Sequence, residues 1–417
     1  MEGCCLPLHQ NILKMKSDQQ LTANPPSVTN IIAPPMFLVV ILSLGTFIIF
    51  FQGFMVAPIL PGLAMLFHVS VRHVSFFEPA YLLGYGFVTL VYAPLSDKYG
   101  RFPVILFSLT CFIVLTACTA FCHSITQMII LRLLTGLGAG GVAPITIGWI
   151  GDNFPYEKRG HALGIFFGFM AGGMAFGSSA GALLTAQLGW QMMFWVAAAV
   201  GACVLLVLMI NAKYFLQRNT RHAGGFRIMY QSLKEIFCLP RGWRTYLFVL
   251  FNGMFHSGVF AWTGYFFYKN YHLNEREIGF ALLGYGIPGL LFGPMLGKLA
   301  DKFGRNKIIP IGILVGALSA ITLGINYSLA VSCMAIATLS LGFDLTQPLY
   351  AAIITTLSPK KGAATGLFAF FLFMGYGFGS LIFSLIVNIG LNQTFRLFGI
   401  VALVVAFMAV SNFKNEK

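Results

Sequence analysis

The sequence predicts an all-α polytopic membrane protein whose twelve transmembrane helices form two pseudo-symmetric six-helix bundles. The chain is 58% hydrophobic and only 9% charged, with a mean hydropathy of +0.82, whereas a soluble domain keeps about a quarter of its residues charged. The sequence Asp-Lys-Tyr-Gly-Arg at 97–101 also recurs as Asp-Lys-Phe-Gly-Arg at 301–305, an offset of 204 residues. Each copy lies in a short gap between long apolar stretches, which indicates two related membrane bundles.

Apolar stretches of about 20 residues, long enough to cross a hydrocarbon core of ~30 Å, recur along the chain. In the first half we expect spans near 36–60, 76–95, 103–122, 126–151, 161–184 and 190–212. In the second half we expect them near 244–268, 277–298, 306–325, 328–353, 363–388 and 394–413. The predicted domains are a cytoplasmic tail over 1–35, a bundle over 36–212, a cytoplasmic linker over 213–243, a second bundle over 244–413 and a cytoplasmic tail over 414–417.

A second repeat supports the duplication. Spans five and eleven share a row of glycines at an offset of 202 residues, and such rows permit close helix approach. The paired glycines are Gly164, Gly173 and Gly177 in the first half and Gly366, Gly375 and Gly379 in the second. The sequence Leu-Leu-Gly-Tyr-Gly at 82–86 also recurs at 282–286. Its offset of 200 is a helical turn out of register, so we give this echo no weight.

The basic charge follows membrane sidedness. If both termini are cytoplasmic, 21 of the 26 basic residues fall on the cytoplasmic side, four fall on the other side, and Arg132 lies within a span. This is the positive-inside bias of polytopic proteins, so the net charge of +14 reports topology and not nucleic-acid binding. We therefore expect a multi-pass protein of the cell inner (cytoplasmic) membrane. Apolar residues at helical spacing in the linker predict an amphipathic surface helix.

Three sequence patterns carry a resemblance. The nine residues at 297–305 read Gly-Lys-Leu-Ala-Asp-Lys-Phe-Gly-Arg, the copy at 93–101 begins with Ala, and Arg132, Gly136 and Gly138 follow an Arg-x-x-x-Gly-x-Gly pattern in span four. With these motifs the chain resembles the major facilitator superfamily of transporters over nearly its full length. The resemblance implies the major facilitator fold and alternating access around a central site.

Within that superfamily the chain is most similar to the twelve-span drug/proton antiporter branch. It departs from that branch at two places. Ser178 replaces the proline of the exporters' fifth-span motif, and Gln52 stands where many members carry an aspartate. These departures leave the direction of transport open.

The resemblance also implies that the charged repeats latch the two halves in the outward-facing state, and that these contacts break when the cytoplasmic side opens. In this interpretation Arg101 pairs with Asp152, and Gly100 permits the turn. The alternative is that the residues form only a tight charged turn. The full set of latch candidates is Asp97, Gly100, Arg101, Asp152, Arg159, Asp301, Gly304 and Arg305.

Charged residues inside a bilayer are costly and are therefore candidates for function. We expect Asp344 in span ten to carry a proton, although it could instead anchor a cationic substrate or act in helix packing. Arg132 could pair with Glu78, which could otherwise be interfacial. His256 could relay protons or be a packed, hydrogen-bonded core residue, and Gln52 is expected to line the cavity.

Span seven carries a high density of aromatic residues, which suggests a stacking wall for a lipophilic solute, although lipid-facing packing explains most of them equally well. These residues are Phe251, Phe255, Phe260, Trp262, Tyr265, Phe266, Phe267 and Tyr268.

The function expected from these features is secondary active transport, with proton-coupled export of small amphipathic compounds placed first. The alternative is proton-coupled uptake of a nutrient such as an organic acid, sugar or siderophore. We expect no enzymatic activity, because no His, Asp or Glu cluster lies at one membrane face. The predicted partners are a small-molecule substrate, protons and the lipid bilayer, with no nucleic acid, no metal and no cofactor, and the protein is expected to be a monomer.

Overall fold

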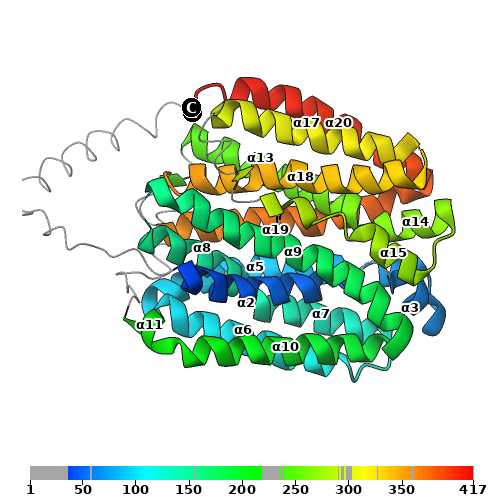
Figure 1. Cartoon of the computed structure of the whole chain (residues 1–417), viewed down its shortest axis with the longest axis horizontal. Coiled ribbons are helices and arrows are strands. Elements are labelled where there is room, and N and C mark those ends of the chain that lie inside the picture. The colour runs from blue at the N-terminus through cyan, green and yellow to red at the C-terminus, as the bar shows by residue number, and fades with distance from the viewer. Residues whose placement is uncertain are drawn as a thin grey trace, which may run out of the picture. The chain divides into compact units, whose positions relative to one another are not determined.

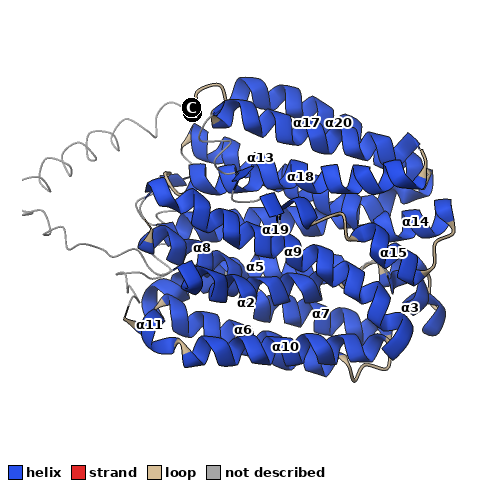
Figure 2. Ribbon diagram, viewed as in Figure 1, coloured by secondary structure: helices blue, strands red, loops and turns tan. Residues whose placement is uncertain are grey.

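The computed structural model describes residues 36–56, 59–154, 156–217, 235–236, 239–289, 291–292, 295–296, 303–325, 327–357 and 361–416. Within these ranges every regular element is a helix (Figure 2). The first half contains α2 (Met36–Phe54), α3 (Leu60–Leu66), α4 (Val71–Val74), α5 (Phe77–Tyr99), α6 (Arg101–Thr119), α7 (Ile125–Ala139), α8 (Val142–Asn153), α9 (Tyr156–Leu188), α10 (Trp190–Ile210) and α11 (Ala212–Leu216). The second half contains α13 (Pro240–Ala261), α14 (Thr263–Tyr271), α15 (Glu275–Leu282), α17 (Arg305–Ile325), α18 (Leu329–Ile354), α19 (Lys361–Ile386) and α20 (Leu391–Asn412), all labelled in Figure 1. A short 3-10 helix, η2 (Val387–Ile389), precedes α20.

Nine helices in the described part of the chain are long and apolar enough to cross a membrane. The all-α polytopic class is therefore confirmed, and the twelve-span count is consistent with these helices. The eighth predicted span is only partly described. The predicted linker helix and Asp301 lie outside the described residues, and so does the side chain of Arg159.

Glycines let the fifth and eleventh spans approach the first and seventh closely. A Cβ atom on Gly177 of α9 would collide with the carbonyl oxygen of Phe51 in α2. In the second half, a Cβ on Gly379 of α19 would collide with the carbonyl oxygen of Met254 in α13. Gly173 and Gly375 make the corresponding contacts one turn earlier. The two halves therefore build equivalent helix pairs.

The neighbouring glycines differ in their surroundings. Gly366 faces the other half of the molecule, where an added Cβ would lie 2.7 Å from the Cβ of Ala93 in α5. Gly164 is buried within α9.

The repeat at 82–86 and 282–286 also marks equivalent positions. A Cβ on Gly86 would lie 3.0 Å from the backbone nitrogen of Met374 in α19, and a Cβ on Gly286 would collide with the carbonyl oxygen of Ala171 in α9. Both glycines thus lie where a second span meets a helix of the other half. Contrary to the sequence-based expectation, this repeat is structurally meaningful, because both copies contact a helix of the other half despite the shift of one turn.

Contacts also show which helix ends lie on the same side. Gly366 lies against Ala93 near the end of α5, and Ala364 accepts a 3.1 Å hydrogen bond from the hydroxyl of Tyr246 near the start of α13. The first turn of α13 in turn contacts Glu416, beyond the end of α20. We call this side, where α5 ends and α13 and α17 begin, the charged side.

Candidate functional site

Arg132 is fully buried and is held by backbone oxygens of the first span. Its Nη1 donates to the carbonyl oxygen of Gln52 at 3.1 Å and to the Gln52 side-chain oxygen at 2.8 Å. Its Nη2 donates to the carbonyl oxygen of Gly53 at 2.6 Å. The guanidinium carbon also lies 4.5 Å from the ring centroid of Tyr81 in α5. Arg132 therefore joins α7 to the end of α2 and to α5, and Gln52 accepts two of its hydrogen bonds.

Glu78 does not form the predicted ion pair with Arg132. Among the described residues no oxygen of Glu78 lies within 4.0 Å of that guanidinium, although the two charges interact at longer range. The hydroxyl of Ser257 in α13 instead donates to Glu78 Oε1 at 3.5 Å. Glu78 is only 4% exposed, so its side chain is packed within the protein, and its placement at the membrane interface stays a prediction. Its hydrogen bond crosses from the first half to the second.

Asp344 lies deep in α18 and is 5% exposed. The hydroxyl of Ser340 donates to its Oδ2 at 3.1 Å. The carboxylate lies against Gly289, where a Cβ atom would come within 2.6 Å of both carboxylate oxygens. A larger residue at 289 would therefore displace the carboxylate, and the glycine makes room for it.

One phenol lies within electrostatic range of both buried acids. Tyr285, three residues beyond the end of α15, lies within electrostatic range of both Asp344 and Glu78. Its ring also lies against that of Phe260, with a centroid distance of 4.0 Å and an angle of 33° between the ring planes. Glu78 belongs to the first half and Asp344 to the second, so Tyr285 is influenced by the charges of acids from both halves.

His256 is a core residue in this structure. It is 1% exposed, and its ring makes edge contacts with Phe255 at 5.0 Å and with Phe343 at 5.2 Å. Neither ring nitrogen has a hydrogen-bond partner among the described residues. The surroundings of His256 therefore match a packed core residue better than a proton relay, although the described residues provide no hydrogen bond to its ring.

Aromatic rings fill the centre of the interface between the halves. The ring centroids of Phe50 in α2 and Phe373 in α19 lie 5.7 Å apart, and those of Phe54 in α2 and Phe260 in α13 also lie 5.7 Å apart. The space bounded by Phe50, Phe54, Tyr85 and Phe373 has no room for a water molecule. Of the aromatic residues predicted to form a wall in span seven, Phe260 makes a ring contact with the other half.

Three polar residues near this region gave no distinctive signal in the sequence. Asn252 of α13 donates to the hydroxyl of Thr346 in α18 at 2.9 Å. Gln347, one residue further on, is fully buried, and its amide oxygen and nitrogen have no hydrogen-bond partner among the described residues. Because uncharged polar residues are common in helices, only their position in the fold distinguishes them.

The first charged repeat forms the expected ion pair. Arg101 Nε donates to Asp152 Oδ2 at 2.7 Å, and both side chains are nearly buried. Gly148 makes this possible, since a Cβ there would collide with the Arg101 guanidinium. Gly100 has a φ of 96°, a left-handed conformation that glycine adopts without strain. Asp97 is half-buried at the end of α5.

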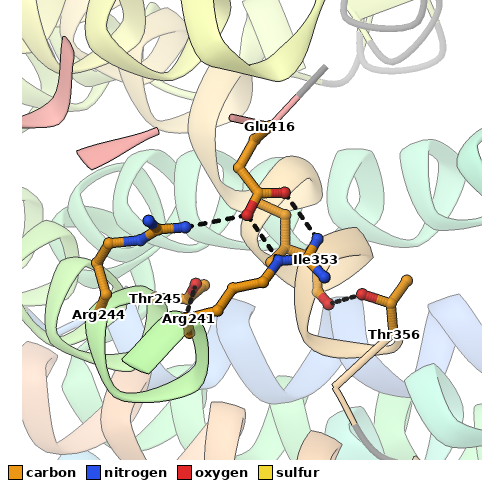
Figure 3. Close-up of polar contacts among 6 residues, drawn as sticks. All are labelled: Arg241, Arg244, Thr245, Ile353, Thr356 and Glu416. Atoms are coloured by element: carbon orange, nitrogen blue, oxygen red, sulfur yellow. Dashed lines mark hydrogen bonds and ion pairs between the residues drawn. The ribbon is translucent and has the colours of Figure 1, made fainter. Parts of the chain in front are cut away.

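The second charged repeat lies beside an acid that we did not predict. Gly304 has a φ of 87°, like Gly100, and Arg305 begins α17. The Glu416 carboxylate accepts hydrogen bonds from Arg241 Nε at 2.6 Å, from Arg241 Nη2 at 2.7 Å and from Arg244 Nη2 at 3.0 Å (Figure 3). Its backbone oxygen accepts a 2.8 Å hydrogen bond from the amide of Asn306. We call this arrangement the Glu416 clamp.

Electrostatics agree with an ionised Glu416. Hydrogen bonds from Arg241 lower the pKa of this carboxyl, partial burial opposes that effect, and the charges of Arg241, Arg244 and Arg305 add to the lowering. Since the group lies beyond the end of α20, it belongs to the charged side and not to the central region.

The described helices are apolar and long enough to span a bilayer. They pack closely at glycines in equivalent pairs in the two halves, and charged residues are buried between them. These features define a polytopic membrane protein with an internal repeat. The family model described as Major Facilitator Superfamily matches residues 42–274 and 264–417. The chain therefore belongs to the Major Facilitator Superfamily, whose members are transporters, and the predicted resemblance is confirmed.

Individual relatives agree with this assignment. The "Uncharacterized MFS-type transporter YwfA" of Bacillus subtilis is 26% identical over 78% of this chain and 77% of its own length. "Multidrug resistance protein 3" of the same organism is 30% identical, over 37% of this chain and 31% of its own length. Among solved structures, the human organic anion transporter MFSD10 superimposes with a TM-score of 0.71 at 16% identity, covering 90% of this chain and all of that chain. At this identity the structural likeness supports the fold alone.

Proposed function

We propose that this transporter exports small amphipathic compounds in exchange for protons, by alternating access between its two halves. The observation that carries the proposal is the pair of buried acids, Glu78 and Asp344, which come from opposite halves and both interact with Tyr285. Acids that can gain and lose a proton at a mobile interface are suited to couple proton movement to the rocking of two bundles. Relatives named as multidrug transporters and efflux pumps support the direction of export.

The aromatic interface supports an amphipathic substrate. Rings from both halves, such as Phe54 and Phe260, meet beside the acids, and ring faces bind flat apolar groups and cations. In the described structure these rings contact one another. Ser75, just before α5, donates to Ser384 of α19, and Thr89 of α5 donates to the carbonyl oxygen of Gly366 in α19. We infer that this is a closed state, in which substrate would have to separate the rings.

We also propose a sidedness for the chain. The charged side would face the cytoplasm, and both termini would lie there, because most basic residues fall on that side. The membrane would be the bacterial inner membrane, as bacterial relatives suggest. Labelling of single cysteines introduced at Lys98 and at Lys269 with an impermeant reagent would test this orientation, since the two are expected on opposite sides.

A second candidate is proton-coupled uptake of an organic acid. It is favoured by Arg132, whose Nε is buried without a hydrogen-bond partner among the described residues. That donor could bind a substrate carboxylate if α2 moved. The proposal of export ranks first because both other guanidinium nitrogens already donate to Gln52 and Gly53.

Inverted membrane vesicles test the function directly. The lumen would be loaded with a pH-sensitive dye and acidified, and ethidium or tetraphenylphosphonium would be added to wild type, Asp344→Asn and Glu78→Gln. We expect proton efflux on addition to wild type and its loss in both variants. The variant Lys98→Gln, which removes an exposed charge, should behave as wild type. Proton efflux that survives both acid substitutions would contradict the coupling role of this pair.

Substrate direction is tested in the same system. If no compound releases protons from inverted vesicles while an organic acid such as lactate accumulates in right-side-out vesicles, the uptake alternative replaces export.

A further inference from the structure

A groove on the charged side runs between the first turn of α17 and the last turns of α20. Its volume is about 540 Å³. It is lined by Asn306, Lys307, Phe407, Val410, Ser411 and Lys414. None of these residues belongs to the central region between the halves, so the groove is a separate feature of the second half.

The groove is positively charged. Lys307 and Lys414 are both exposed, and neither ammonium group has an ion-pair partner among the described residues. Glu416 is the acid nearest to Lys414 in the chain, but its carboxylate is occupied by Arg241 and Arg244. The first turn of α17 adds to the effect, because a helix N-terminus favours negative charge. Among the lining residues that the structure describes, none carries a negative charge.

The Glu416 clamp fixes the shape of this groove. The hydrogen bond from the Asn306 amide to the Glu416 backbone oxygen ties the segment after α20 to the start of α17. Phe413, on the same segment, is fully buried against Phe248 with a ring distance of 4.9 Å. Lys414 is thus carried on a fixed turn beside Lys307, and not on a free tail.

The wall of the groove that continues along α20 is apolar and exposed. Phe407 is 71% exposed and Val410 is 58% exposed. In a transmembrane helix such side chains contact acyl chains. The groove therefore combines a cationic end at the membrane surface with an apolar wall that enters the bilayer, which matches the two parts of a phospholipid.

We propose that this groove binds an anionic phospholipid of the leaflet on the charged side, with the phosphate between Lys307 and Lys414 and an acyl chain along Phe407 and Val410. Basic pockets between transmembrane helices bind anionic headgroups in this way, with each lysine contributing about 1 kcal/mol. The proposal does not depend on which solute the protein transports or in which direction.

Lipid titration of the full-length protein tests the site. The purified protein would be delipidated in mild detergent, and the bound lipid would be counted by native mass spectrometry with phosphatidylglycerol or phosphatidylcholine. For Lys307→Gln/Lys414→Gln we expect the affinity for phosphatidylglycerol to fall about thirtyfold, the equivalent of about 2 kcal/mol. The variant Lys307→Arg/Lys414→Arg should keep the affinity. Lys269→Gln/Arg276→Gln, which removes two exposed cations elsewhere, should do so as well.

Three results would overturn the proposal. Phosphatidylglycerol binding that is unchanged in the Lys307→Gln/Lys414→Gln variant would place the lipid elsewhere. Equal affinity for phosphatidylglycerol and phosphatidylcholine would reduce the groove to a nonspecific apolar surface. Competition by inorganic phosphate as effective as by the lipid would show a site for free anions and not for a phospholipid. Because both lysines are exposed, the variants are expected to fold, and their unfolding temperature would be compared with that of wild type.

Discussion

Arg101 of the first half and Arg305 of the second lie 204 residues apart at equivalent places in the charged repeats, but their surroundings differ. Arg101 is buried and pairs with Asp152 at the end of α8. The same offset leads from Asp152 to Thr356, an uncharged residue whose hydroxyl donates to the carbonyl oxygen of Ile353 (Figure 3). In the second half the acid within electrostatic range of Arg305 is instead Glu416, whose carboxylate pairs with Arg241 and Arg244.

The two halves also differ at the position of the first half that corresponds to Glu416. Gly189 and Gly390 precede the last long helix of each half with positive φ angles of 82° and 122°, and they align at an offset of 201. That offset brings Glu416 onto Phe215, whose buried ring stacks on Phe102 at 4.8 Å. The first half therefore closes its charged side with an aromatic stack and an internal ion pair, and the second with an acid from the segment after α20. Duplicated folds can keep a turn while exchanging the contacts that secure it.

The largest effect is expected in the first half. Arg101→Gln or Asp152→Asn leaves a buried charge without its partner, which costs about 3–5 kcal/mol of the free energy of unfolding. Thermal unfolding of the purified protein in detergent would measure the loss. Lys98→Gln, an exposed neighbour, is the control. Single variants that unfold at the wild-type temperature would show that the pair contributes little.

A smaller effect is expected from the Glu416 clamp. Glu416→Gln should cost about 1–2 kcal/mol, because hydrogen bonds to charged groups are lost but Arg241 is 44% exposed and water screens the interaction. Hydrogen–deuterium exchange should rise in peptides containing the first turns of α13 and α17, and not in α6. A loss as large as that of Asp152→Asn would contradict the distinction between the two halves.

The pH dependence of the Glu416 clamp follows from its lowered pKa. A carboxyl whose folded-state pKa lies below its usual value of 4.5 stabilises the fold fully above that value, and the stabilisation is lost as the pH falls through the folded-state pKa. The difference in unfolding temperature between wild type and Glu416→Gln should therefore be constant from pH 8 to about 5 and shrink below about 4.5. A difference that grows on acidification would contradict an ionised Glu416.

A structural feature of this protein can be predicted from the sequence mainly where its sequence motif is repeated in both halves. The glycine rows and the pairing of Arg101 with Asp152 follow from motifs that recur or have a known geometry. Glu416 has no counterpart in the first half, and a single acid after the last span carries no periodic signal. Its role therefore depends on tertiary contacts with α13 and α17.

The central region shows a different limit. Depth along a helix placed Arg132 and Glu78 at a similar level, and this suggested a pair. Depth does not specify which face of each helix is turned inward, and the guanidinium instead contacts backbone oxygens of Gln52 and Gly53. Backbone oxygens belong to every residue type, so no side-chain pattern could have indicated these two acceptors. The third acceptor, the side-chain oxygen of Gln52, belongs to a residue that the sequence did single out. The same holds for Tyr285, whose position between two acids depends on the packing of both halves.

The smallest effect is expected from restoring an acid at position 356, where the second half has Thr356 in place of the first half's Asp152. If Glu416 supplies the charge that Thr356 lacks, the variant Thr356→Asp should recover part of the stability lost in Glu416→Gln. We expect a gain of less than about 1 kcal/mol, because Thr356 is exposed and exposed ion pairs are weak. Thr356→Asp in the wild-type background should have almost no effect, since Arg241 and Arg244 already have an acid. Equal gains in both backgrounds would show that the new carboxylate acts independently of Glu416. Position 356 would then correspond to Asp152 in the sequence repeat, but Glu416 would not replace the stabilising role of Asp152.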